Sequence, residues 1–246
     1  MRIRNLNELS DEDEFKADLV IVGGGPAGLT IASQLADLPI KIILLESGLL
    51  DESLDHDALN TLELTNLEET SDWLALRAAF HSPSIPSFDP IQQAFGVRSR
   101  GIGGAARYWG AKVALLEPSD FCSRDWVPHS GWPIDEAEVL PFVGRAERLL
   151  NLESSEEEKR RGPAFDSLGP SRWRYARASG SERRTFDFRA EWLGRRQTNL
   201  FVVTNATVTR IITNEHGSQF EGLSVTSMEG RRLLVRAREC VLAAGT

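Results

Sequence analysis

Three glycines near the start of the chain have the spacing of a phosphate-binding turn. Gly23, Gly25 and Gly28 form a G-x-G-x-x-G pattern directly after the apolar run over residues 19–22. The first glycine permits a tight turn, the second lets a phosphate approach the backbone, and the third lets a helix pack closely on a strand. The pattern therefore predicts a pyrophosphate site whose donors are the unpaired N–H groups at the start of a helix.

An acidic residue completes this unit. Glu46 follows Gly28 by 18 residues and ends a second apolar run over residues 40–45. An acid at this place accepts hydrogen bonds from a ribose, and it favours FAD or NAD over NADP because NADP carries a phosphate there. Glycine turns also occur for purely structural reasons, without binding a ligand. The joint occurrence of strand, glycines, helix and acid favours a dinucleotide.

A second glycine cluster lies at residues 98–110, with the sequence RSRGIGGAARYWG. Its small residues would let the backbone approach a flat or charged group, and Tyr108 and Trp109 could line a ring system. Taken alone, the cluster fits a cofactor loop and a glycine-rich packing turn equally well.

The elements that must position these residues can be predicted from periodicity. The runs 19–22 and 40–45 are typical of parallel strands buried on both faces, and Leu29, Ala32 and Leu35 share one face of a helix between them. Further strands are predicted at 200–203, 207–212, 220–226 and 232–236, followed by a buried strand from residue 239. The fold class is therefore α/β, with a Rossmann-like parallel sheet and a small antiparallel meander.

One helix is predicted between the second glycine cluster and the final strands. Asp135 and Glu138 have the spacing of a capping pair, and Pro141 is expected at the first position of a helix.

Composition narrows the class of protein. The net charge of −8 over 246 residues argues against general binding to nucleic acid or to anionic membranes. The two cysteines and four histidines show no metal-ligand spacing, so we expect reduced thiols and no metal. The N-terminus has no apolar signal core, and no apolar run approaches the roughly 20 residues of a membrane helix. We therefore expect a cytoplasmic protein without membrane insertion.

In this order, the motifs resemble the N-terminal, FAD-binding half of the glucose–methanol–choline (GMC) oxidoreductase family. The matching blocks are residues 23–28 with 46–48, 100–110, 120–134, and 205–212 with 241–245. The resemblance implies that residues 1–246 form one FAD-binding domain portion. Its nucleotide-binding core would cover about 15–50 and 196–246, with an inserted flavin loop and helical segment at about 51–195. The family's C-terminal substrate-binding and catalytic half is absent.

The resemblance also implies cofactor contacts. Gly23, Gly25, Ala27 and Gly28 would hold the pyrophosphate, and Glu46 the adenosine ribose. Residues Gly103, Gly104, Ala105, Tyr108, Trp109 and Gly110 would lie along the flavin and ribityl chain. Val208 would meet the adenine, and Ala244 and Gly245 would pass close to the diphosphate. Ser47 and Arg100 are also expected among the cofactor-binding residues. Some family members tether flavin to a histidine at the place of Tyr108, so non-covalent FAD is expected here.

The implied activity is oxidation of a CH–OH group of an alcohol or sugar-like substrate. In this chemistry a base removes the hydroxyl proton while hydride moves to flavin N5. The family's base, a histidine with a histidine or asparagine partner, lies in the C-terminal half, so no catalytic residue is assigned here. We expect that half on a second polypeptide, making a heteromer, unless the chain is a truncation.

Two alternative functions compete with this reading of the sequence. A degenerate FAD-domain protein without catalysis is consistent with the missing base. An NAD(P)H-dependent flavoprotein reductase is disfavoured, because residues 101–104 lack the preceding strand and following helix of a second nucleotide site.

Overall fold

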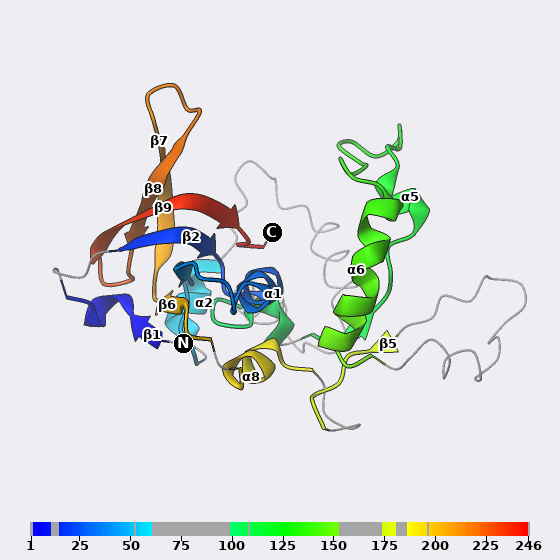
Figure 1. Ribbon diagram of the computed structural model, residues 1–246, viewed down its shortest axis with the longest axis horizontal. Coiled ribbons are helices and arrows are strands. Elements are labelled where there is room, and N and C mark those ends of the chain that lie inside the picture. Colours follow the sequence, from blue (N-terminus) through cyan, green and yellow to red (C-terminus); the bar gives the residue numbers. More distant parts are fainter. Residues whose placement is uncertain are drawn as a thin grey trace, which may run out of the picture. The chain divides into compact units, whose positions relative to one another are not determined.

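The computed structural model describes residues 2–10, 15–51, 53–60, 99–107, 109–152, 174–180, 186–195 and 197–245. The chain divides into two compact units, Met1–Tyr108 with Phe188–Thr246, and Trp109–Asp187. The first unit contains β1 (Arg2–Asn5), β2 (Lys16–Val22), α1 (Pro26–Gln34), β3 (Ile42–Leu45), α2 (Leu54–Asp57), α8 (Phe188–Leu193), β6 (Leu200–Thr204), β7 (Thr207–Thr213), β8 (Phe220–Thr226) and β9 (Arg232–Leu242) (Figure 1). It also has short 3₁₀ helices at Leu6–Glu8, Ala58–Asn60 and Gly104–Arg107. The second unit contains β4 (Lys112–Val113), α5 (Pro118–Phe121), α6 (Glu136–Leu149) and β5 (Arg174–Tyr175).

The first unit is built on one seven-stranded sheet with the order β1-β6-β3-β2-β9-β8-β7. Strands β1, β6, β3, β2 and β9 pair in parallel, whereas β7, β8 and the first half of β9 form an antiparallel meander (Figure 1). The predicted α/β class, a parallel sheet with a small meander, is confirmed.

Strand β9 corrects one expectation. Separate strands were predicted at 232–236 and from 239, but a single strand runs from Arg232 to Leu242. It pairs with β8 through Val235 and with β2 through Cys240. The polar Arg236 does not end the strand, because its position still pairs with Lys16 of β2.

Strand β1 was not predicted. It pairs in parallel with β6, placing Ile3 opposite Val202. The strand has only four residues, two of them exposed arginines, and therefore no apolar run. A sequence pattern cannot reveal such a short edge strand. The pairing nevertheless brings the N-terminal segment to the sheet, and Leu6 directly after it is fully buried.

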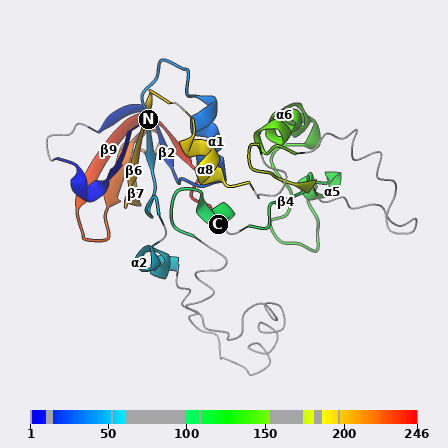
Figure 2. The same ribbon diagram turned by 90° about the horizontal axis from the view of Figure 1, so that it is seen from below.

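Two apolar layers cover the central strands, which are buried on both faces as predicted for β2 and β3. On one face the strands pack against α1 and α8, which lie together on that side (Figure 2). On the other face they pack against the meander and the N-terminal segment. The first layer includes Ile21, Leu29, Ala32, Leu44, Trp192 and Val202, and the second Val20, Ile43, Leu45, Leu223, Val225 and Val235.

In the second unit, α6 begins where the capping pair predicts. The Asp135 side chain accepts from the Glu138 N–H, and the Glu138 side chain accepts from the Asp135 N–H. Pro141 was expected at the first helical position, but it lies inside α6. The cap at Asp135 starts the helix earlier, and a proline within it removes a single backbone donor.

In the part of the chain that the structure describes, no helix is long and apolar enough to cross a bilayer.

Candidate nucleotide-binding site

The glycine turn after β2 is tightly packed at two of its glycines. Gly23 has a φ of +107° and donates its N–H to the Leu45 carbonyl at 2.8 Å. A Cβ on Gly23 would lie 2.3 Å from the Ala243 oxygen, and a Cβ on Gly28 would lie 2.0 Å from the Gly23 oxygen. Both positions therefore require glycine for the backbone to pack.

Gly25 is different, because a Cβ there would meet only the Gly104 backbone, at an ordinary van der Waals distance. It precedes α1 with extended backbone and makes no side-chain cap, and a Cβ there would find nothing nearer than the Gly104 Cα at 3.9 Å. The first helical N–H groups, including that of the exposed Ala27, have no carbonyl of a preceding turn to bind. A glycine at an uncapped helix start leaves free the backbone donors that a phosphate group binds, with no side chain of its own in the way.

Glu46 connects this turn to the loop after β3. The side chain is buried, with 6% exposure. Its Oε2 accepts from the Gly24 N–H at 2.7 Å, and its Oε1 accepts from the Gly48 N–H at 2.8 Å. Bonds of this kind to a carboxylate are stronger than neutral ones. Oε1 also accepts from Ser47 Oγ at 3.3 Å, whereas Oε2 keeps a further acceptor position. The acid thus fixes both loops and can still accept a bond from a hydroxyl.

The second glycine cluster lies against the same two loops. Gly103 donates its N–H to the Gly24 carbonyl at 2.8 Å, and Ile102 donates to the Leu49 carbonyl at 3.1 Å. A Cβ on Gly104 would lie 3.0 Å from the Gly25 Cα. The two glycine clusters, far apart in sequence, therefore meet at Gly25. These contacts show that the second glycine cluster has a packing role. They lie next to the uncapped N-terminus of α1.

Arg100 is held by protein groups on several sides. Its backbone N–H donates to Asp57 Oδ1 at 2.7 Å, its Nε donates to Asn60 Oδ1 at 2.8 Å, and its Nη1 donates to Ser47 Oγ at 3.0 Å. The guanidinium thus supports the loop that carries Glu46.

The remaining predicted contacts are distributed over several places. Ala244 follows β9 and its Cα packs against Gly23, with Gly245 next to it. Val208 lies in β7 opposite Val225. Ala105 is exposed in the 3₁₀ helix Gly104–Arg107. In the second unit, Trp109 donates its indole N–H to the Phe186 carbonyl at 3.0 Å, and Gly110 is exposed. Tyr108 lies outside the described residues.

Four residues of this region have a structural role that the sequence did not assign to them. A Cβ on Gly48 would lie 2.2 Å from the Arg100 carbonyl carbon, and one on Gly24 would lie 2.9 Å from Glu46 Oε2. Asn205 has a φ of +55°, which an asparagine between two β-branched strands could have suggested. His56 is buried, and no sequence pattern marks it.

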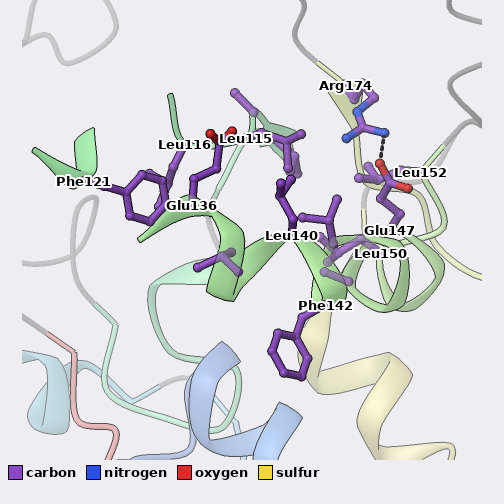
Figure 3. A pocket seen from close by; sticks show the side chains of 15 residues that line it. Leu115, Leu116, Phe121, Glu136, Leu140, Phe142, Glu147, Leu150, Leu152 and Arg174 are labelled. Atoms are coloured by element: carbon purple, nitrogen blue, oxygen red, sulfur yellow. Dashed lines mark hydrogen bonds and ion pairs between the residues drawn. The ribbon is translucent and has the colours of Figure 1, made fainter. Parts of the chain in front are cut away.

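The second unit has an apolar groove of about 270 Å³ beside α6 (Figure 3). Phe121 lies toward one end, and the ion pair of Glu147 with Arg174 (2.5 Å) lies toward the other. Its apolar walls include Leu115, Leu116, Leu140 and Leu150. The walls suit an apolar group, and the Glu147 carboxylate is already paired with Arg174.

Within the described ranges, no three His, Cys, Asp or Glu residues gather as a metal site would require.

Comparison with known proteins gives several matches. Glucose dehydrogenase [FAD, quinone] of Drosophila melanogaster is 23% identical over 279 residues, covering 98% of this chain and 43% of that protein. Paromamine 6'-oxidase of Streptomyces fradiae is 24% identical over 161 residues, covering 62% of this chain and 27% of that protein. The solved structure of pyridoxine 4-oxidase from Mesorbium loti has a TM-score of 0.53 and 22% identity, with coverage of 93% and 49%. No family model matches the chain.

The fold and the glycine turns define the class, an α/β protein of the dinucleotide-binding type. The matches support the resemblance found in the sequence: the chain is similar to an FAD glucose dehydrogenase and to a paromamine 6'-oxidase. It spans less than half the length of these relatives.

Proposed function

We propose that this chain is the FAD-binding portion of an oxidoreductase that oxidises a CH–OH group of an alcohol or sugar-like substrate. The observation that carries the proposal is the meeting of both glycine clusters at Gly25, with Glu46 bonded to Gly24 beside it. Relatives named as an FAD glucose dehydrogenase and as a paromamine oxidase support the cofactor and the class of reaction.

The residues present fit FAD. The backbone at Gly25 and the start of α1 would bind the pyrophosphate, because no Cβ occupies the approach. Glu46 would accept from the adenosine ribose, while its bonds to Gly24 and Gly48 hold it in place. When bound, FAD supplies the acceptor for hydride from the substrate carbon. The cofactor is proposed to be non-covalent, since Tyr108 stands where some family members have a tethering histidine.

No residue of this chain is proposed as the catalytic base. Among the described histidines, His56 is buried in contact with Ser53 and Asn205, and His129 and His216 are exposed. We propose that the base and the substrate pocket come from sequence beyond this portion. In the relatives the matched and unmatched parts belong to one polypeptide, which favours that arrangement over the second polypeptide expected from the sequence.

The proposal is tested on the protein purified at its full natural length, by a visible spectrum and by the intact mass of every chain present. Flavin that absorbs at about 450 nm and is released into the supernatant by acid supports non-covalent FAD. Alcohols and sugars are then screened for turnover. Flavin that stays with the precipitated protein would overturn the non-covalent assignment. Absence of flavin, with no binding of added FAD, would overturn the proposed function.

A further inference from the structure

A chain of buried polar contacts starts at His56 in α2. Its Nδ1 is 2.9 Å from Ser53 Oγ, and its Nε2 is 3.1 Å from Asn205 Oδ1. His56 is 5% exposed and Asn205 is 2% exposed. Polar groups buried to this extent stay in place only when they are paired, so this contact fixes α2 against the turn between β6 and β7.

The direction of these hydrogen bonds is set by Asn205. Its Nδ2 donates to Glu229 Oε2 at 2.8 Å, and its Oδ1 accepts from the Met228 N–H at 2.9 Å. The amide orientation is therefore determined, and His56 Nε2 must donate to Oδ1. Nδ1 is then left to pair with the Ser53 hydroxyl.

Both ends of this network hold the loop that carries Glu46. On one side, the Asn205 N–H donates to the Gly48 carbonyl at 2.8 Å, and the Ala206 N–H donates to the Glu46 carbonyl at 2.9 Å. The loop thus receives two backbone bonds from the turn that His56 fixes.

On the other side, Asp57 follows His56 directly in α2. Asp57 accepts from the Arg100 N–H at 2.7 Å, and Arg100 donates to Ser47 Oγ at 3.0 Å. The Glu46–Gly48 segment is therefore held from two directions that meet at His56.

We propose that His56 and Asn205 are positioning residues that fix the Glu46–Gly48 segment for the adenosine side of the dinucleotide. The inference rests on the proposed function. The backbone bonds from Asn205 and Ala206 end on Gly48 and Glu46, so we expect the effect of His56 and Asn205 to fall mainly on the adenosine half of the ligand.

The test uses substitutions in the protein at its full natural length. His56→Leu removes both ring contacts, and His56→Gln keeps a donor for Asn205 Oδ1. Asn205→Gly removes the amide but keeps a backbone that favours a φ of +55°. The matched control is His216→Leu, the same change at an exposed histidine. Ser53→Ala removes only the hydroxyl that pairs with His56 Nδ1, and it replaces His56→Leu as the test variant if that protein does not fold.

Affinities for FAD, ADP-ribose and FMN are measured beside the thermal midpoint of each variant. We expect His56→Leu and Asn205→Gly to weaken FAD and ADP-ribose binding about five- to tenfold, with FMN binding unchanged. Ser53→Ala should weaken ADP-ribose binding about twofold, and His56→Gln and His216→Leu should stay near wild type.

Equal losses for ADP-ribose and FMN would indicate a merely structural role and overturn the inference. Unchanged ADP-ribose binding in Asn205→Gly would overturn it as well. The wild-type FAD titration separates the two claims. A wild-type protein that binds no FAD would defeat the proposed function itself, whereas wild-type binding with unaffected variants would defeat only the positioning role.

Discussion

Glu46 shows how a single carboxylate can organise two loops before any ligand arrives. Its two oxygens accept from the N–H groups of Gly24 and Gly48, which follow different strands. Burial removes competing water, so these charge-assisted bonds hold the end of β3 against the glycine turn. A ribose hydroxyl would be an additional donor to an acid that is already oriented.

Gly48 provides a prediction at the residue scale. A Cβ there would lie 2.2 Å from the carbonyl carbon and oxygen of Arg100, and a backbone group cannot swing away as a side-chain end can. Gly48→Ala is expected to lower the free energy of unfolding by about 2 kcal/mol or more. Gly110→Ala is the control, since a Cβ there meets nothing within 4 Å. Urea unfolding compares the two, and equal stabilities would contradict the packing described for Gly48.

Glu229 provides a pH prediction. Hydrogen bonds from Asn7 and then Asn205 lower the pKa of its carboxyl from 4.5 to about 2. A lowered folded-state pKa gives stability that is present above pH 4.5 and is lost as the pH falls toward about 2. Glu229→Gln should therefore lose less stability than wild type when the pH is lowered from about 5 to about 2.5. Urea midpoints at both values test this, and parallel losses in the two proteins would refute it.

At the scale of elements, the predictable parts are the local ones. The β2–α1–β3 unit could be predicted because Leu29 and Ala32 repeat with helical spacing between two apolar runs. The start of α6 could be predicted because the contact of Asp135 with Glu138 spans three residues.

The unpredicted parts depend on contacts across long stretches of chain. Strand β1 forms only because β6 supplies its partner, and β9 stays continuous because β2 continues the pairing that β8 began. In the site, the bond from Gly103 to Gly24 and the contact of His56 with Asn205 have no counterpart in local spacing. Periodicity identifies elements and turns, but it does not tell which distant loops share a hydrogen bond.

Pro141 gives a prediction for α6. It lies inside the helix, where its ring removes a backbone donor that would otherwise bind the Ala137 carbonyl. Pro141→Ala should stabilise α6 by about 1 kcal/mol or more and increase its helical circular-dichroism signal. Pro118→Ala is the matched control, because Pro118 begins α5, where the missing donor costs nothing. A lower thermal midpoint in Pro141→Ala than in wild type would show that the proline suits its position.

The two cysteines should differ in reactivity because their elements differ. Burial in β9 raises the pKa of the Cys240 thiol, while Cys122 at the end of α5 is exposed. At a mildly alkaline pH a thiol reagent should modify Cys122 at least about tenfold faster than Cys240, and denaturant should remove most of the difference. Mass spectrometry of peptides over time measures both rates. Comparable rates in the folded protein would contradict the partial burial of Cys240.

At the scale of the whole molecule, the chain corresponds to less than half of its relatives. We propose that the part of the relatives that this chain does not match covers the remainder of a cofactor bound at the start of α1. We therefore expect this portion alone to bind FAD weakly or to be unstable. Equilibrium titration of the isolated portion against the protein at full natural length tests this, and tight, stoichiometric FAD on the isolated portion would refute it.

The most direct test of the central claim is FAD titration of Gly25→Ala in the protein at full natural length. The nearest atom to a Cβ at Gly25 is 3.9 Å away and the backbone is extended, so the fold should keep its stability. Under the proposed function, the added methyl group would nevertheless obstruct the pyrophosphate. We predict an unchanged thermal midpoint without ligand and a loss of FAD affinity of at least about tenfold. A stable Gly25→Ala protein that binds FAD as well as wild type would show that the cofactor does not approach this turn.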